Sequence, residues 1–279
     1  MHVIQEKSTQ VDGMTIFYRE AGAGEPILLL HGVPTSSYLW RKLMPRLARV
    51  GRAVAPDHYG FGRSDKPVDA DYSVSGYVRY LEGFTAALGL SRLHVIVHDF
   101  GGPFGLGFAI THPERIRSLV IMNTIFHSEY EWHPLARIWR TSGAGEQQMA
   151  EWTRERFVNG MRKWLTHPEH LTAADLDTYY EAIADPAMRA AILRLYRNTT
   201  PAEHPEWEDQ LRRLRVPTLI IWGRQDPFLG AEWAERFHRD LEGSSLFIFD
   251  DAGHFVQEDK PEEVAQLIES FYARRSRKG

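Results

Sequence analysis

Three polar side chains whose types and order suit nucleophilic catalysis each follow a separate apolar run of the sequence. They are Asp99, Asp226 and His254. A carboxylate can attack carbon directly, and a histidine oriented by a second carboxylate can activate the water that hydrolyses the resulting ester. Each residue alone also has an ordinary structural explanation, such as a helix cap or a turn. Together, and in this order, they predict a covalent hydrolytic site.

The segment around Asp99 must position the nucleophile. The apolar run at 93–97 predicts a buried parallel strand that stops at Asp99, and Gly101 and Gly102 lead from it into a helical run. Small residues suit a sharp turn at which strand and helix nearly touch. The N-terminus of the following helix favours an ionised carboxylate. Val97 stands where such a turn usually has its first glycine.

The elements around this segment predict an α/β fold with a doubly wound, mostly parallel sheet, because buried strands alternate with helices. In such a sheet the ligand lies at the carboxyl ends of the strands, where Asp99, Asp226 and His254 are expected. The pattern predicts a hairpin at 2–10 and 14–19, strands at 26–30, 52–57, 117–123, 218–223 and 246–249, and helices at 36–50, 73–90 and 262–272.

A different pattern occupies the stretch from about 125 to 213. It has no clear strand, contains several tryptophans, among them Trp132, Trp139, Trp152 and Trp164, and shows helical runs at 146–165, 172–184 and 186–196. We therefore expect a helical cap domain at 125–213, inserted between the two parts of a core domain at 1–124 and 214–279.

Composition excludes several other classes of protein. The 279 residues carry a formal net charge of −4, which argues against nucleic acid as a partner, and there is no cysteine. The first residues lack the pattern of a signal peptide and no apolar run is long enough to span a membrane, so we expect a cytoplasmic protein. No dinucleotide motif follows a strand, and His167 and His170 lie in a polar turn without obvious partners. We expect neither a metal nor an organic cofactor.

Four motifs together resemble the α/β-hydrolases with an aspartate nucleophile, namely the haloalkane dehalogenases and the epoxide hydrolases. The resemblance covers nearly the whole chain and implies the α/β-hydrolase fold. It implies that Asp99 is the nucleophile, that His254, oriented by Asp226, is the base, and that the backbone N–H groups of Val33 and Phe100 meet the oxyanion. The motifs are His31-Gly32-x-Pro34, Gly60-Phe61-Gly62-Arg63-Ser64, Val97-His98-Asp99-x-Gly101-Gly102 and Asp251-Ala252-Gly253-His254.

The leaving group distinguishes the two activities. The dehalogenases commonly solvate the halide with N–H donors placed where this chain has Phe100 and Val33, whose side chains donate no hydrogen bond. The epoxide hydrolases place cap tyrosines at the ring oxygen, and the segment Leu195-Tyr196-Arg197-Asn198 resembles their Tyr-Arg-Asn segment. The second cap donor is not identified by the resemblance, and Tyr130 and His133 are the candidates.

The sequence therefore predicts an epoxide hydrolase that acts on a small hydrophobic substrate with water. Two alternatives stay open. One is a haloalkane dehalogenase that finds its halide donors in the cap, for example a tryptophan. The other, from a different class, is a hydrolase-fold protein that binds a small hydrophobic ligand without turnover. The pattern indicates neither the identity of the substrate nor the oligomeric state.

Overall fold

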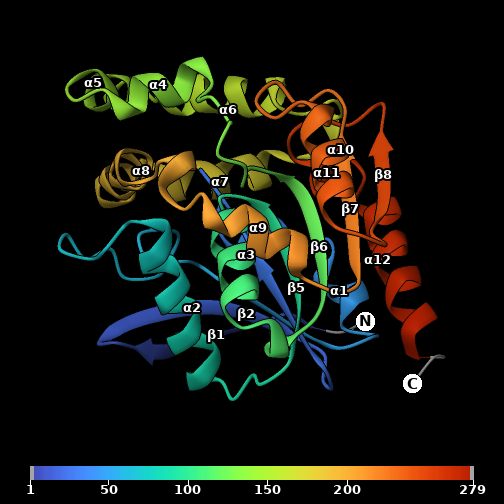
Figure 1. The fold of residues 1–279 in the computed structure, drawn as a ribbon. Coiled ribbons are helices and arrows are strands. Elements are labelled where there is room, and N and C mark those ends of the chain that lie inside the picture. The colour runs from blue at the N-terminus through green and yellow to red at the C-terminus, as the bar shows by residue number, and fades with distance from the viewer. Residues whose placement is uncertain (1–2, 277–279) are drawn as a thin grey trace.

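An eight-stranded sheet forms the centre of the molecule (Figure 1). The structure is a computed structural model and describes residues 3–276. The strand order is β1-β2-β4-β3-β5-β6-β7-β8. Strand β2 pairs antiparallel with β1 and β4, and the other neighbouring pairs are parallel. The strands are β1 (Gln5–Val11), β2 (Met14–Ala21), β3 (Pro26–Leu30), β4 (Arg52–Pro56), β5 (Leu93–Asp99), β6 (Ile116–Thr124), β7 (Thr218–Gly223) and β8 (Ser245–Phe249).

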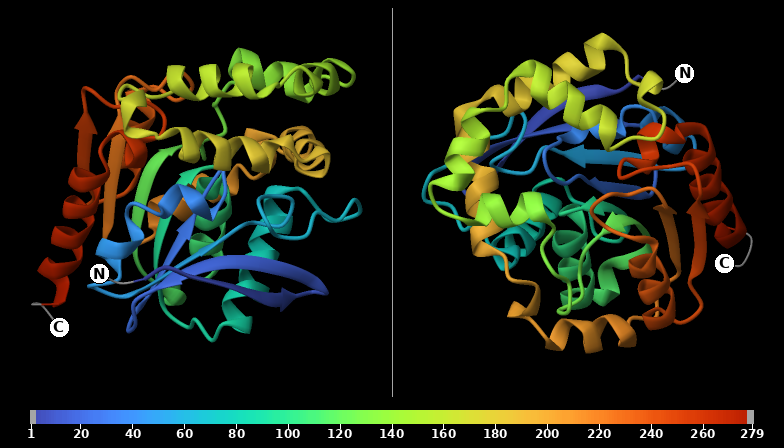
Figure 2. Two further views of the ribbon diagram at one scale, coloured as in Figure 1. Left: turned by 180° about the vertical axis from the view of Figure 1, so that it is seen from behind. Right: turned by 90° about the horizontal axis from the view of Figure 1, so that it is seen from above.

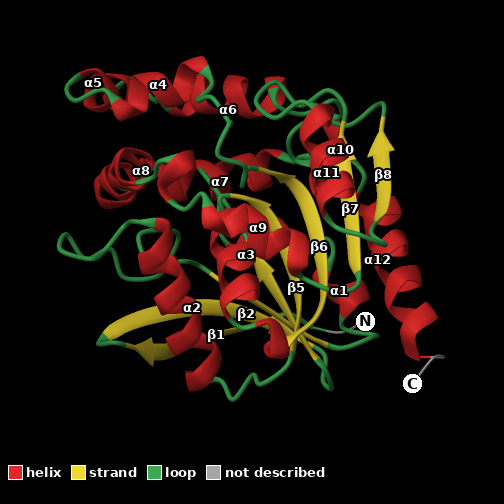
Figure 3. Cartoon of the chain, in the orientation of Figure 1, coloured by secondary structure: helices red, strands yellow, loops and turns green. Residues whose placement is uncertain are grey.

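Helices cover the sheet, as the colouring by secondary structure shows (Figure 3). Helices α2 and α3 pack together and contact β1 and β5, while α1 and α12 pack together and contact β4 and β7. The α-helices are α1 (Met44–Leu47), α2 (Val74–Ala87), α3 (Gly101–Thr111), α4 (Pro134–Arg140), α5 (Ala144–Ala150), α6 (Arg154–Lys163), α7 (Ala173–Ala184), α8 (Pro186–Asn198), α9 (Glu206–Arg213), α10 (Ala231–Asp240), α11 (Val256–Asp259) and α12 (Pro261–Ser276). Short 3-10 turns are η1 (Ser37–Trp40), η2 (Pro113–Arg115), η3 (Pro168–His170) and η4 (Pro201–Glu203).

This arrangement confirms the predicted α/β-hydrolase fold class, with local differences. The N-terminal hairpin forms because Asp12 and Gly13 adopt φ values of 49° and 81°, which a tight turn between twisted strands requires. The single helix predicted at 36–50 is wrong: η1 and α1 replace it. Pro45 lacks the N–H that a continuous helix would need, so the chain restarts the helix there. The helix predicted at 146–165 is likewise two helices, because Thr153 caps a new start at Arg154.

Helices α4 to α8 lie in two layers on the side of the sheet toward which β7 and β8 point (Figure 1), and the views from behind and from above agree (Figure 2). The division into a core at 1–124 and 214–279 and a cap at 125–213 stays a prediction. Within the predicted cap, α9 contacts α3, one of the helices that cover the sheet. Among residues 3–276, no helix is long and apolar enough to cross a membrane.

Candidate active site

The turn after β5 holds Asp99 in a strained conformation. Its φ is +51°, a region that side chains other than glycine rarely adopt. A Cβ on Gly101 would lie 2.2 Å from the Leu30 carbonyl oxygen, and one on Gly102 would lie 1.7 Å from the Thr124 hydroxyl. Neither position has room for a side chain, so the two glycines allow the helix to begin directly behind the nucleophile.

Val97 departs from the usual glycine pattern of this turn, and the structure shows why it is tolerated. A Cβ added to Gly105 of α3 would lie 2.6 Å from a Val97 methyl group. The space that Val97 fills is therefore provided by a glycine one turn into the facing helix. Strand β5 and helix α3 still approach closely, because the glycine lies on the helix, at Gly105, and not on the strand, at Val97.

The carboxyl group of Asp99 lies against the loop that follows β3. The Val33 N–H donates to Asp99 Oδ1 at 2.6 Å, and the Phe100 N–H also bonds the carboxyl group. A Cβ on Gly32 would lie 2.1 Å from the same oxygen, which explains the glycine. Burial raises the pKa of Asp99 above its ordinary value, against the lowering effects of His254 and of these two N–H groups. The backbone N–H groups lower the pKa of Asp99, in the direction expected for the start of a helix, but burial outweighs them.

His31 supports this loop and does not face the reacting atoms. Its Nδ1 bonds the Gly32 carbonyl at 2.9 Å, and its Nε2 accepts from the His58 N–H at 3.1 Å. These partners are consistent with one neutral tautomer, and burial lowers the pKa of His31 to about 4. Pro34, the last residue of the motif, lines the cavity in front of Asp99.

His254 lies between Asp99 and Asp226. Its Nδ1 lies 2.8 Å from Asp226 Oδ2, and its Nε2 lies 3.7 Å from Asp99 Oδ2. Burial alone would lower the pKa of His254, but the charge and the hydrogen bond of Asp226, followed by the charge of Asp99, raise it above the ordinary value. The structure thus brings together the three residues that the sequence placed on separate strand ends.

Asp226 is held by more groups than the sequence analysis identified. Its Oδ1 accepts the N–H groups of Phe228 and Leu229 at 2.8 and 3.1 Å, and its Oδ2 accepts Nδ2 of Asn123 at 2.7 Å. Asn123 lies near the carboxyl end of β6 and has a φ of +31°. The rule that places ligands at strand ends could have found Asn123, because its strand lies between those of Asp99 and Asp226.

The backbone of His254 is held on both sides by residues that the sequence analysis did not assign. Its N–H donates to the Trp164 carbonyl at 2.9 Å, and its carbonyl oxygen lies 2.8 Å from His98 Nε2. Since a carbonyl only accepts, His98 carries its proton on Nε2. His254 is therefore anchored both to the loop after α6 and to β5, the strand that carries Asp99.

An aromatic cavity opens in front of Asp99, between the strand ends and the helices above them. Tyr196 and Tyr130 line it. Burial, followed by the charge of Asp99, raises the pKa of both tyrosines, so each phenol stays protonated and can donate. The other lining residues are Val33, Pro34, Phe100, Ile125, Trp132, His133, Leu135, Trp139, Trp164, Phe228, Leu229, His254 and Phe255.

His133 also reaches the cavity, but part of its capacity is used. Its Nδ1 accepts the Ala136 N–H at the start of α4, at 3.2 Å, and its ring packs on Phe228. Burial, followed by the charge of His254, lowers the pKa of His133 to about 4. The ring is therefore neutral near pH 7, and only its Nε2–H is left to donate.

Taken together, the site can form and hydrolyse an ester. Asp99 faces the cavity with Oδ1 held by the Val33 N–H and Oδ2 near His254, and the Phe100 N–H also bonds the carboxyl group. Those N–H groups can stabilise negative charge on the carboxyl oxygen when water adds to the ester, a type of contact worth about 2.7–4 kcal/mol per donor in other enzymes.

Comparison with known proteins agrees with this geometry. The alpha/beta hydrolase fold family matches residues 25–261. The chain is 32% identical to a 2-hydroxy-6-oxo-2,4-heptadienoate hydrolase of Pseudomonas putida, over 94% of both chains. It is 30% identical to a haloalkane dehalogenase of Mesorhizobium japonicum, over 92% of this chain and 87% of that protein. The structure of the epoxide hydrolase CorEH shares the fold, with a TM-score of 0.81 at 23% identity over 98% of this chain and 99% of that one. The chain therefore belongs to the alpha/beta hydrolase fold family and is a hydrolase.

Proposed function

We propose that this hydrolase opens a small hydrophobic epoxide to a vicinal diol through a covalent ester on Asp99. The observation that carries the proposal is the pair of cap tyrosines. Tyr196 and Tyr130 both line the cavity of Asp99, and their pKa values both respond to its charge. An epoxide oxygen stays on the product and must gain a proton, which is what a phenol can supply.

In the first step, Oδ2 of Asp99 bonds to an oxirane carbon and the ring C–O bond breaks. The electron pair goes to the ring oxygen, which takes a proton from a tyrosine hydroxyl. Oδ1, which accepts the Val33 N–H, stays as the ester carbonyl oxygen. No charged base is needed for this step, since the nucleophile is already a carboxylate.

In the second step, water adds to the carboxyl carbon of Asp99 while His254 takes its proton. The ester then breaks, and the leaving alkoxide takes that proton back. The remaining water proton on Asp99 restores the tyrosine, so the balance is epoxide plus water to diol. Once esterified, Asp99 no longer carries the charge that raises the pKa of His254, and the base form becomes more available when it is needed.

Haloalkane dehalogenase is the second candidate, because of the cavity tryptophans. The indole groups of Trp132 and Trp164 line the cavity and are N–H donors that a halide could use. Trp139 is less suitable, since its N–H already donates to Gln148 at 2.6 Å. The similarity to a named haloalkane dehalogenase supports this candidate as well. A cytoplasmic location stays a prediction.

One screen distinguishes the two reactions. The protein is incubated with styrene oxide and with 1-bromobutane, and diol and bromide are measured side by side. We expect diol formation that falls at least tenfold in Tyr196→Phe and in Tyr130→Phe. Tyr180→Phe is the matched control, because this tyrosine is half-buried on α7 outside the lining of the cavity. Bromide release without diol from any epoxide would replace the proposal with the dehalogenase.

A further inference from the structure

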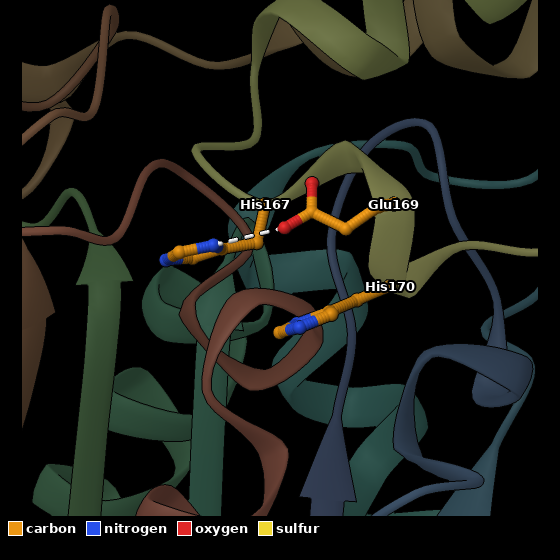
Figure 4. A group of neighbouring side chains, drawn as sticks. All are labelled: His167, Glu169 and His170. Carbon is orange, nitrogen blue, oxygen red and sulfur yellow. Dashed lines mark hydrogen bonds and ion pairs between the residues drawn. The ribbon is translucent and has the colours of Figure 1, made fainter.

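Three side chains with metal-ligating atoms gather next to the loop that carries the catalytic histidine. His167 follows α6, and Glu169 and His170 belong to η3 (Figure 4). One ligand atom from each lies within 4.8 Å of the other two, and among the described residues this is the group of three that could hold an ion. The site is separate from Asp99, and the proposed reaction does not use it.

The first two ligands already have a suitable spacing. Nδ1 of His167 and Oε1 of Glu169 are 3.2 Å apart. Ligands at 2.0–2.1 Å from a tetrahedral zinc ion lie about 3.3 Å from each other. The ring of His170 stacks beside that of His167, with centroids 5.1 Å apart. The two rings are nearly parallel, so the His170 ring has to turn and move inward before its nitrogen can point at an ion shared with His167, and an exposed side chain can make that change.

The second nitrogen of each histidine is directed at an acceptor. Nδ1 of His170 lies 2.9 Å from the Asp259 carbonyl oxygen, so it carries the proton and leaves Nε2 as the ligand. Nε2 of His167 lies 3.6 Å from Asp251 Oδ2 and is a buried atom with no hydrogen-bond partner. Histidines that bind metals usually donate their other ring N–H to a carbonyl or a carboxylate, as His170 does here, whereas Asp251 is near His167 Nε2 without a hydrogen bond.

The backbone of the site is fixed to the core. The N–H groups of Thr166 and His167 donate to the carboxylate of Asp259 at 2.7–3.2 Å, and the Gly253 N–H donates to the same carboxylate at 2.7 Å. The carbonyl of Trp164, in the same loop, accepts the N–H of His254. A ligand bound here would therefore stabilise the segment that anchors the catalytic histidine.

We propose that His167, Glu169 and His170 form a binding site for one divalent transition metal ion of the zinc type, with water as the remaining ligand. Two imidazoles and a carboxylate are ligands that zinc accepts, and the ion would stabilise the turn at 167–170, which is bonded to Asp259 and lies near Asp251. The proposal departs from the sequence-based expectation of no metal, because only the fold brings Asp251 and Asp259 to these histidines. Lys42 donates to the His170 carbonyl and Lys260 pairs with Asp251, so we expect moderate affinity.

The test uses tag-free, chelator-treated full-length protein titrated with zinc chloride by calorimetry and with cobalt chloride by visible absorption. We expect binding of about one equivalent with moderate affinity, the visible bands of tetrahedral cobalt, and a rise in melting temperature of about 5 °C at a hundredfold excess over Kd. His167→Ala and His170→Ala should each abolish all three signals. The matched control is His112→Ala, whose histidine lies near Glu82 and Glu114 but has no second histidine.

A set of unchanged signals in the double variant His167→Ala/His170→Ala would overturn the proposal, since other histidines would then bind the metal. Loss of the signals in His112→Ala alone would also overturn it. Glu169→Gln keeps the test informative if a histidine variant fails to fold, because the exposed glutamate can change without loss of packing. That variant should lose at least tenfold in affinity and keep its melting temperature in the absence of metal.

Discussion

Replacement of His254 by glutamine should stop the reaction after its first half. Glutamine fills much of the same space but cannot take a proton from water, so the ester on Asp99 should persist. A positioned general base contributes about 10²–10⁴-fold, or about 3–5 kcal/mol at 1.36 kcal/mol per tenfold. We therefore expect hydrolysis of the ester to slow by that factor, while attack by Asp99 still proceeds.

The structure adds one condition to this experiment. His254 lowers the pKa of Asp99, and its removal lets the pKa of the carboxyl group rise further. The first step is therefore best measured over a series of pH values, because the ionised fraction of Asp99 in the variant rises with pH. Intact-protein mass spectrometry after incubation with styrene oxide should show a gain of one substrate mass, and peptide mapping should place that gain on Asp99.

The controls decide what the adduct means. His254→Gln combined with Asp99→Asn should stay unmodified. His112→Gln should behave as the unaltered protein, because His112 lies at the opposite end of α3 from Asp99. If the unaltered protein turns over styrene oxide and His254→Gln accumulates no adduct at any pH of the series, the covalent mechanism is wrong.

Three further predictions follow from the charges and the packing of the site. Asp226→Asn removes the charge that raises the pKa of His254, so the acidic limb of the pH–rate profile should move to lower pH while kcat falls. Asp99→Asn should raise the melting temperature at pH 7.5. Burial raises the pKa of this carboxyl group, so its ionisation costs folding stability. The difference in melting temperature between the variant and the unaltered protein should shrink as the pH falls below the pKa of Asp99 in the folded state. Gly102→Ala puts a methyl group 1.7 Å from the Thr124 hydroxyl and should lower the free energy of unfolding by about 1–3 kcal/mol. Gly160→Ala lies inside α6, where the nearest atom to the added methyl group is 3.4 Å away, and should raise the free energy of unfolding by about 0.5–1 kcal/mol. Denaturant unfolding measures both changes.

The strand ends were predictable because strong local signals mark them. Apolar runs of four or five residues bounded by glycine, proline or aspartate predict buried strands, and parallel strands place their carboxyl ends at one edge. Asp99, Asp226 and His254 could therefore be grouped before any coordinates were known. The predicted helix at 36–50 failed for the opposite reason, because a helical spacing of apolar residues does not outweigh the missing N–H of Pro45.

The helices above the sheet were less predictable. The helical runs between residues 146 and 196 were recognised. Helices α4 and α9 were not, because each is a short helix of seven or eight residues whose stability comes from packing. The same limit applies to the second cap donor. Tyr130 lies outside any regular element and reaches the cavity only through the path of the loop after β6.

The sequence by itself determined the α/β sheet and the strand ends that carry Asp99, Asp226 and His254, because each strand end depends on residues close together in the chain. Only the tertiary structure decided that Gly105 makes room for Val97, that Asn123 holds Asp226, and that burial outweighs the helix N-terminus at Asp99. These effects join residues that are distant in sequence or depend on the exclusion of water, and no local pattern encodes either of them.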